Sequence, residues 1–268
     1  MIKTDTAHTK LQTFGEAVGA RTVIAQSIEY DDGAREIAHV HHRAQLVYAT
    51  TGIVRVVTPS GLWMLTHGRA LLIRSQIEHE LHMVGNVSMR TLYIEPDALD
   101  DFAGEGRVVE VGELLRAYVL GMFDASVDEH SRQTLLAPLI LRTLQASTDS
   151  PATTRLPLPA SARVRRICEA LIAHPSIDET LDRWGERVGA SSRTLARMFR
   201  EEAGMTFGQW REQLRLVEAI SKLSTGRAVS DVAHDLGYAD ARTFSAMFRR
   251  AFGCSPQEHQ RRNGVNAV

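Results

Sequence analysis

Two histidines, His39 and His41, are separated by one residue near the N-terminal end of the chain. Side chains at positions i and i+2 of a strand point to the same face of a sheet, so both imidazoles would face one interior. Neutral imidazole is a good ligand for Zn, Ni, Cu or Fe. The pair predicts a site for a divalent transition metal. The alternative is that both histidines are polar pocket residues that contact a small-molecule effector.

A second set of residues occurs twice near the C-terminal end. Leu195, Phe199 and Gly204 have spacings of four and five, and Phe244, Phe248 and Gly253 repeat these spacings 49 residues later. In each copy an amphipathic helix ends at a glycine, and a second helix then begins with small polar and guanidinium side chains. Such side chains suit base contacts in the major groove. One helix-turn-helix pattern occurs in many helical bundles, but two copies are typical of a protein that enters successive major grooves.

The second copy resembles the AraC family of transcription regulators at Val232-Ala233, Gly237-Tyr238, Phe244, Phe248-Arg249, Gly253, Ser255-Pro256 and Arg261. The resemblance covers about residues 160 to 263. It implies two recognition helices and a connecting helix over 207–223 that fixes their spacing. The residues it assigns to base contacts are Ser192, Arg193, Ala196 and Arg197 on the first helix, and Asp240, Ala241, Arg242, Ser245 and Ala246 on the second. Because two of the latter are alanines, we expect fewer hydrogen bonds to bases there and more contact with thymine methyl groups.

The first hundred residues have a different pattern, in which short apolar runs alternate with Gly, Asp and Asn. This pattern predicts an antiparallel sandwich or barrel. The expected strands are 21–28, 44–49, 52–58, 61–66, 70–73, 79–83 and 88–94.

Part of this region resembles the cupin fold, an antiparallel double-stranded β-helix. The spacing of Gly33, His39, His41 and Gln45 is similar to the first cupin motif, and His79 falls in a partial match to the second. The resemblance implies a metal site made of His39, His41, Gln45 and His79. Gln45 stands where the motif has glutamate. Its neutral amide removes a charge, so we expect weaker metal binding and a preference away from hard cations.

At 268 residues and 44% hydrophobic content, the chain has room for two domains with cores of their own. Apolar residues at helical intervals predict helices over 108–123 and 131–145, and a proline-rich stretch follows them. We expect the helical pair to mediate dimerisation. The predicted α+β organisation is a cupin-like sensor barrel over 1–100, the helical pair over 101–146, a linker over 147–160, and an all-α double helix-turn-helix domain over 161–268.

Charge is distributed unevenly along the chain. The net charge is −1, but residues 161–268 contain 17 basic and 13 acidic residues, whereas residues 1–160 contain 14 and 19. The basic surplus therefore falls on the predicted DNA-binding half, although it is modest. No apolar run has membrane-spanning length, and the first ten residues are polar, so we expect a cytoplasmic protein. Cys168 and Cys254 are expected to be buried or incidental thiols, with a redox-sensing pair as the alternative.

Three functions from different classes are compatible with these features. The first is a transcription regulator controlled by an effector in the barrel. The second is a metal-dependent cupin enzyme tethered to DNA, and the third is an architectural DNA-binding protein. Gln45 argues against the enzyme, and the acidic N-terminal half argues against the architectural protein. The regulator is favoured, and its expected partners are an operator in double-stranded DNA, a small-molecule effector, a second copy of the chain and RNA polymerase, with no membrane.

Overall fold

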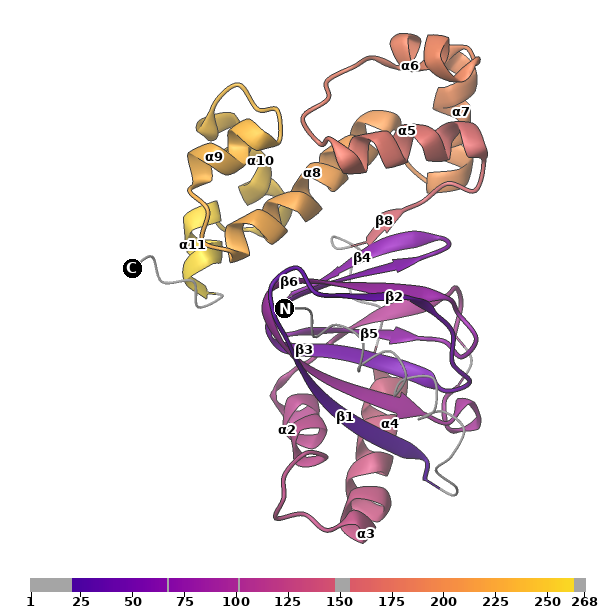
Figure 1. The fold of residues 1–268 in the computed structure, drawn as a ribbon, viewed down its shortest axis with the longest axis vertical. Coiled ribbons are helices and arrows are strands. Elements are labelled where there is room, and N and C mark those ends of the chain that lie inside the picture. The colour runs from indigo at the N-terminus through magenta and orange to yellow at the C-terminus, as the bar shows by residue number, and fades with distance from the viewer. Residues whose placement is uncertain (1–20, 67, 101, 148–154, 263–268) are drawn as a thin grey trace, which may run out of the picture. The chain divides into compact units, whose positions relative to one another are not determined.

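The computed structural model describes residues 21–262 except 67, 101 and 148–154, and it consists of two compact units (Figure 1). The first unit comprises residues up to 58 and residues 65–152, and the second comprises 59–64 and 153 onward. The first is an antiparallel sheet with helices, and the second is mostly helical, so the predicted α+β organisation is confirmed. Residues 1–20 of the predicted sensor domain and 148–154 of the predicted linker lie outside the described residues. Among the described residues, no helix combines the length and apolarity needed to cross a bilayer.

The sheet of the first unit is built around two long strands. Its strands are β1 (Val23–Tyr30), β2 (Arg35–His39), β3 (Ala44–Thr58), β5 (Arg69–Ile73), β6 (His79–Ile94) and β7 (Gly106–Glu110). Strand β6 pairs with β1, β2 and β3, and β5 pairs with β3 and β7, all antiparallel. The predicted strands 44–49 and 52–58 form one strand, as do 79–83 and 88–94. The turn-like residues between the predicted strands lie inside the long strands. There the pairing of β3 with β6 shifts register on either side of Thr51.

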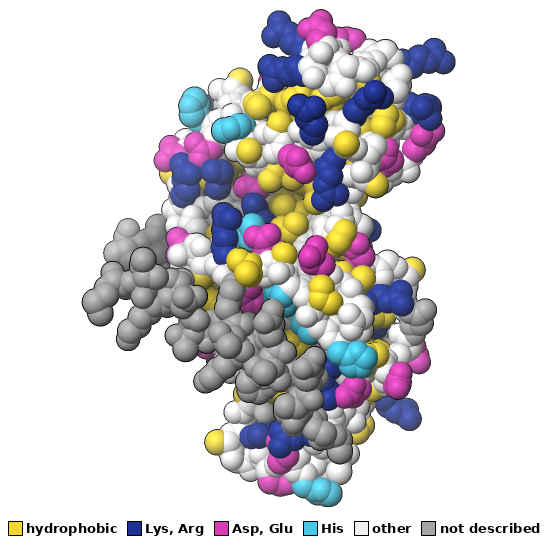
Figure 2. All heavy atoms as spheres, turned by 45° about the vertical axis from the view of Figure 1, so that its right-hand side comes forward, with side chains coloured by type: hydrophobic (Ala, Val, Ile, Leu, Met, Phe, Trp, Pro, Cys, Tyr) yellow, Lys and Arg dark blue, Asp and Glu magenta, His cyan; other side chains and the backbone are white. Residues whose placement is uncertain are grey.

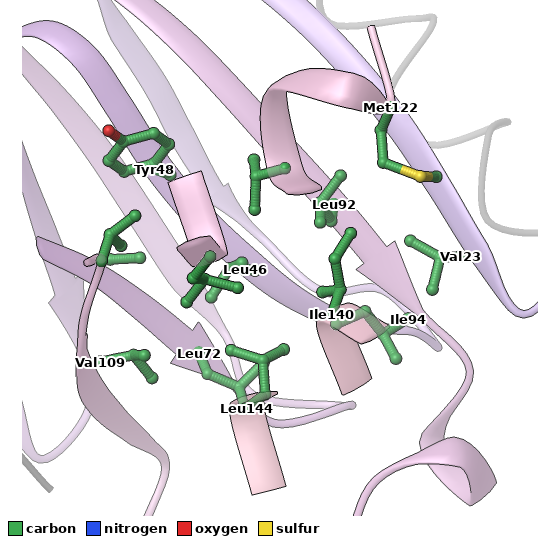
Figure 3. Close-up of a cluster of buried hydrophobic side chains, with 14 of the residues drawn as sticks. Val23, Leu46, Tyr48, Leu72, Leu92, Ile94, Val109, Met122, Ile140 and Leu144 are labelled. Carbon is green, nitrogen blue, oxygen red and sulfur yellow. The ribbon is translucent and has the colours of Figure 1, made fainter. Parts of the chain in front are cut away.

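One face of this sheet is covered by helices of the same unit. Ala44, Leu46 and Tyr48 alternate along β3 and pack against α2 (Glu113–Gly121) and α4 (Ala137–Ala146) in one buried cluster (Figure 3). The short segments α3 (Glu129–Ser131) and η2 (Arg132–Leu136) precede α4, and η1 (Pro96–Ala98) follows β6. Because Gln45 alternates with these core residues, it lies on the opposite face of the sheet.

The predicted start of the first of these helices at Val108 is wrong. Residues 106–110 instead form β7, in which Val108 and Val109 are buried beside Leu71 and Ala70 of β5. β-Branched side chains favour an extended backbone when both faces of a strand can be covered. The helix begins only after Gly112.

The second unit contains two helix-turn-helix pairs, α6 (Leu181–Val188) with α7 (Ser192–Ala203) and α9 (Val229–Asp235) with α10 (Ala241–Phe252). Helix α5 (Ala162–Ala173) precedes them and α11 (Pro256–Arg262) follows. The connecting helix α8 (Phe207–Ser224) lies between the pairs in sequence. Its predicted apolar face is buried, as Trp210, Leu214, Val217 and Ile220 show.

Part of the predicted linker is a structural element of the second unit. Residues Arg155–Pro157 form β8, which pairs antiparallel with residues 61–63 of β4 (Gly61–Leu65). The indole nitrogen of Trp210 donates a hydrogen bond to the Pro157 carbonyl at 2.7 Å, and the Gln213 amide donates to the Arg155 carbonyl. Two carbonyls of β8 are thus bonded to α8, so these linker residues have a fixed place in the unit.

Candidate functional site

The first predicted recognition helix, α7, exposes its predicted polar residues. Its N-cap is Ser191, whose hydroxyl accepts a hydrogen bond from the Thr194 backbone at 3.2 Å. Leu195 and Phe199 are fully buried and anchor the helix. Among the remaining predicted residues, Arg193 and Arg197 are exposed, and Ser192 and Ala196 are half-buried. The N-terminal part of α7 therefore presents the guanidinium groups that the sequence predicted for DNA contact.

The second recognition helix, α10, begins at an acidic cap. The Asp240 carboxylate accepts hydrogen bonds at 2.8 Å from the backbone N–H groups of Arg242 and Thr243. The bonds from Thr243, and then the one from Arg242, hold the pKa of Asp240 below its ordinary value. Asp240 was predicted to contact bases, and here its charged side chain caps the helix; a base contact by Asp240 stays a prediction.

A surface groove of about 1080 Å³ runs beside α10. Four of the predicted residues line it, namely Ala241, Arg242, Ser245 and Ala246, and so does Arg249, which the sequence analysis missed. Arg249 follows Arg242 by two helical turns, so the 3.6-residue period was a signal that could have identified it. The groove combines small side chains with guanidinium groups, as a surface that contacts bases and phosphates requires.

Not every exposed arginine of these helices is equally available. The Arg197 guanidinium pairs with both carboxylate oxygens of Glu201, at 3.0 and 2.8 Å. Arg200, also missed from the sequence, is exposed one turn after Ala196. In Figure 2, Lys and Arg side chains gather at the end that α6 and α7 occupy in Figure 1. Arg197 must therefore release the Glu201 carboxylate before it can bind a phosphate or a base.

One side chain of α8 contacts both the segment before α6 and the turn between α9 and α10. Arg215 is 8% exposed, and its Nε donates a hydrogen bond to the Pro175 carbonyl at 3.2 Å, ahead of α6. Its guanidinium carbon lies 5.3 Å from the ring centroid of Tyr238, which follows α9. Arg215 thus links the segment before α6 to the turn between α9 and α10.

In the first unit, the four predicted metal-site residues come together on the sheet face opposite α2 and α4. Ligand nitrogens of His39, His41 and His79 all lie within 4.8 Å of one another. The side-chain oxygen of Gln45 lies 3.0 Å from Nε2 of His41 and 2.8 Å from Nε2 of His79. The predicted residues thus form one cluster, which we call the histidine pocket.

Backbone carbonyls set the protonation pattern of the three imidazoles. The Nδ1 atoms of His39, His41 and His79 lie 2.8, 2.6 and 2.9 Å from the carbonyl oxygens of Ile37, Arg43 and Ile77. A carbonyl oxygen only accepts, so each Nδ1 carries the proton and each Nε2 has a free lone pair. The three Nε2 atoms therefore enter the pocket as acceptors.

The Gln45 amide adds a further acceptor. Its nitrogen donates to the Thr91 hydroxyl at 3.0 Å, and that hydroxyl donates to the Leu46 carbonyl at 3.1 Å, which fixes the amide oxygen toward the histidines. The Gln45 amide thus lies within hydrogen-bond distance of Nε2 of both His41 and His79. Nε2 of His39 is buried and makes no hydrogen bond to any described residue. A cation is the partner that such converging lone pairs fit.

Burial keeps His41 and His79 neutral. It lowers the pKa of His79 to about 3, with the neighbouring His39 as a further cause, and it also lowers the pKa of His41. Neutral imidazole is the form that coordinates a metal. A carboxylate that the sequence analysis missed, Glu36, is also buried beside His39.

Two family models match the chain. The model described as "AraC-like ligand binding domain" matches residues 23–157, which is half of the chain, and the model described as "Helix-turn-helix domain" matches residues 184–262. The first contains the histidine pocket and the second contains both recognition helices.

The chain is similar to several named proteins, which include curated relatives and solved structures. The chain is similar to the HTH-type transcriptional regulator NimR of Escherichia coli, with 28% identity over 81% of this chain and 80% of NimR. It is also similar to the HTH-type transcriptional activator RhaR of Klebsiella pneumoniae, with 27% identity over 85% and 89% of the two chains. The C-terminal domain of AraT, a response regulator from Geobacillus stearothermophilus, is 32% identical over 38% of this chain and 86% of that chain, with a TM-score of 0.36. ToxT from Vibrio cholerae with bound unsaturated fatty acid is 13% identical over 92% and 97%, with a TM-score of 0.40.

Proposed function

Because the chain belongs to the AraC family of DNA-binding transcription regulators with a ligand-binding N-terminal domain, we propose that α7 and α10 bind one operator and that occupancy of the histidine pocket sets the affinity for it. The observation that carries the DNA-binding part is the repeated geometry of the two helices. Each begins at a side-chain cap, buries two aromatic or leucine anchors and exposes arginine on its first turns.

The DNA-binding part is tested by selecting binding sites from a random DNA library with the full chain and measuring their affinity. Arg193→Ala and Arg242→Ala should each weaken the selected site by about 1 to 3 kcal/mol and relax base preference locally. Arg142→Ala on α4, which removes an exposed arginine of the first unit, serves as the matched control and should have no effect. Unchanged affinity in both recognition-helix variants would overturn the proposed docking.

For the histidine pocket we propose a divalent transition metal, Zn, Ni, Cu or Fe, held by His39, His41, His79 and Gln45. The converging lone pairs support this donor set. Purified chain without a histidine tag should bind one equivalent of Zn²⁺, and His39→Ala with His41→Ala should abolish binding. If the unaltered chain binds no metal, the pocket serves only the effector and the metal part of the proposal fails.

A second copy of the chain is the proposed partner of the helical face. Leu114, Leu135 and Leu139 are 60%, 60% and 42% exposed on α2, η2 and α4, although other leucines of these segments pack on the sheet. Such an apolar surface suits a self-complementary dimer contact. Sedimentation of the full chain should give a dimer, and Leu114→Glu with Leu135→Glu should give a monomer. A monomer without the substitutions would contradict the proposal.

The relatives favour regulation over the DNA-tethered enzyme, and we propose that the chain catalyses no reaction. We place the protein in the cytoplasm, where its DNA lies. Contact with RNA polymerase stays a prediction.

A further inference from the structure

The two recognition helices share a pair of exposed arginines. Their 49-residue repeat places Arg193 of α7 at the position of Arg242 in α10. In the same way, Arg200 of α7 matches Arg249 of α10, and all four side chains are exposed. The two arginines of each helix are seven residues apart. They are therefore separated by about two turns, or about 10 Å along the axis, and lie on one face of the helix.

The residue between these arginines differs in the two helices. It is Arg197 in α7 and Ala246 in α10, in each case four residues after the first arginine and three before the second. Both residues are exposed. Side chains three and four positions apart are neighbours on a helix surface, so this residue lies between the two arginines. The exposed face of α7 thus carries three guanidinium groups, whereas that of α10 carries a methyl group between two guanidinium groups.

The hydroxyl groups near Ala246 do not replace the missing hydrogen-bond donor. The Ser245 hydroxyl donates to the Ala241 carbonyl at 2.7 Å. The Thr243 hydroxyl donates to the Asp240 carboxylate at 3.0 Å. Because a hydroxyl has one proton to donate, neither of them has a proton left for a base. The middle of the α10 face therefore offers a base an apolar contact.

The two arginines of α10 are free to contact DNA on either side of this apolar position. Arg242, Ala246 and Arg249 all line the groove beside α10. Within the part of the chain that the structure describes, neither guanidinium group forms a hydrogen bond or an ion pair, whereas Arg250 pairs with Glu212. The N-terminal residues of a recognition helix contact base edges. This places Arg242, on the first turn, at a base, and Arg249, two turns later, at the phosphate backbone.

We propose that α7 and α10 read unlike parts of the operator and that Ala246 sets the difference. This inference rests on the proposed binding of both helices to one operator. Under α10, the Ala246 methyl group contacts the C5-methyl group of a thymine, while Arg242 contacts a neighbouring base and Arg249 a phosphate. Under α7, Arg197 leaves Glu201 and donates two hydrogen bonds to a guanine at the equivalent position.

Selection of duplexes from a random DNA library with the full chain locates the two parts of the operator. Arg193→Ala should relax base preference under α7, and Arg242→Ala should relax it under α10. A thymine should be selected within about three base pairs of the position that Arg242→Ala relaxes, because about 10 Å of helix spans that length of duplex. Arg142→Ala on α4 is the control and should leave the selected sequence unchanged.

Deoxyuridine in place of that thymine tests the methyl contact, because the exchange removes one methyl group and keeps the base-pairing atoms. The unaltered chain should bind the substituted duplex about fourfold more weakly, the factor that corresponds to one buried CH₂ group. In Ala246→Gly this penalty should nearly disappear, because the partner methyl group is gone. Ala162→Gly, at an exposed position on the first turn of α5, is the matched control and should keep the full penalty.

Two further variants test the neighbouring contacts. Ala246→Arg gives α10 the arginine pattern of α7, so the base selected at this position should change from thymine to guanine. Arg249→Ala should weaken binding to all duplexes alike and lower the slope of log affinity against log salt concentration by about one. A change in the selected bases with Arg249→Ala would contradict the assignment of Arg249 to a phosphate.

The outcomes separate this inference from the proposed function. Equal affinity for the thymine and deoxyuridine duplexes at every thymine under α10 would overturn the methyl contact, although DNA binding by both helices would stand. An unchanged selected sequence for an Ala246→Arg variant that binds DNA would show that this position does not read bases. If neither Arg193→Ala nor Arg242→Ala weakens binding, the proposed docking itself fails, and this inference fails with it.

Discussion

The backbone at Gly237 packs directly against Ser176, so that a Cβ atom at Gly237 would lie 2.7 Å from the Ser176 carbonyl oxygen. Gly237 follows α9 with a φ of +78°, and Ser176 precedes α6. The turn between α9 and α10 therefore meets the segment before α6 at backbone atoms, beside the contacts that Arg215 makes to Pro175 and Tyr238.

We expect Gly237→Ala to lower the free energy of unfolding by about 2 kcal/mol or more. An alanine with left-handed backbone alone costs about 1 to 2 kcal/mol, and here the Ser176 backbone must also move. Gly253→Ala is the matched control, because Gly253 has a φ of +71° but its Cβ would meet nothing within 4 Å. Urea unfolding followed by helical circular dichroism measures both. Equal losses in the two variants would contradict a close contact at Gly237.

Glu201 should act as a competitor of DNA for Arg197. Because the carboxylate binds the guanidinium through both oxygens, Glu201→Gln should release Arg197 and strengthen operator binding severalfold, an effect that added salt reduces. Glu186→Gln on α6 is a suitable comparison, because it removes one negative charge from the second unit without touching Arg197. The same gain in both variants would show that general charge, and not the ion pair, sets the affinity.

The metal-free chain should lose stability as the pH falls below about 6.5. An unfolded histidine binds a proton near that pH, whereas the pKa of folded His79 is about 3, so between these values the unfolded state binds more protons. The free energy of unfolding should therefore decrease by about 1 to 2 kcal/mol for His79 between pH 7 and pH 5. Urea unfolding in the presence of a chelator checks this. His79→Gln should remove that share of the decrease. His130→Gln, at an exposed position, is the control and should not. Identical pH profiles for His79→Gln and the unaltered chain would contradict the prediction.

The hydrogen bond from Trp210 to Pro157 should contribute measurably to stability. Trp210→Phe leaves the Pro157 carbonyl without this donor and should lower the free energy of unfolding by about 1 to 3 kcal/mol. Trp184→Phe is the control, since the buried indole nitrogen of Trp184 has no hydrogen-bond partner among the described residues. A larger loss for Trp184→Phe than for Trp210→Phe would mean that packing, and not the bond to β8, dominates.

The sequence was most informative where one local pattern determines the outcome. The 3.6-residue period and the repeated glycines predicted both helix-turn-helix pairs and the buried face of α8, because these depend on neighbouring residues. Strand boundaries depended on pairing that the sequence does not show. The shifts near Thr51 join two predicted strands, and contact with β5 makes Val108 and Val109 a strand.

The same distinction explains the histidine pocket. His39 and His41 could be found by their spacing, and His79 and Gln45 by resemblance. Glu36 could not, because only the bulge in β2, set by its pairing with β6, turns it toward His39. A search for residues two or four positions from His39 on the same strand does not find Glu36, which is three positions away.

The division of the chain into two units also has an optical consequence. All three tryptophans of the chain, Trp63, Trp184 and Trp210, belong to the second unit, whereas the histidine pocket belongs to the first. Intrinsic tryptophan fluorescence of the unlabelled protein therefore originates in the unit that carries the recognition helices. Because Zn²⁺ has no absorption band that overlaps this emission, a spectral change when Zn²⁺ enters the pocket would report a structural response in the other unit. Tryptophan emission thus offers a label-free test of the proposed coupling between the histidine pocket and the recognition helices.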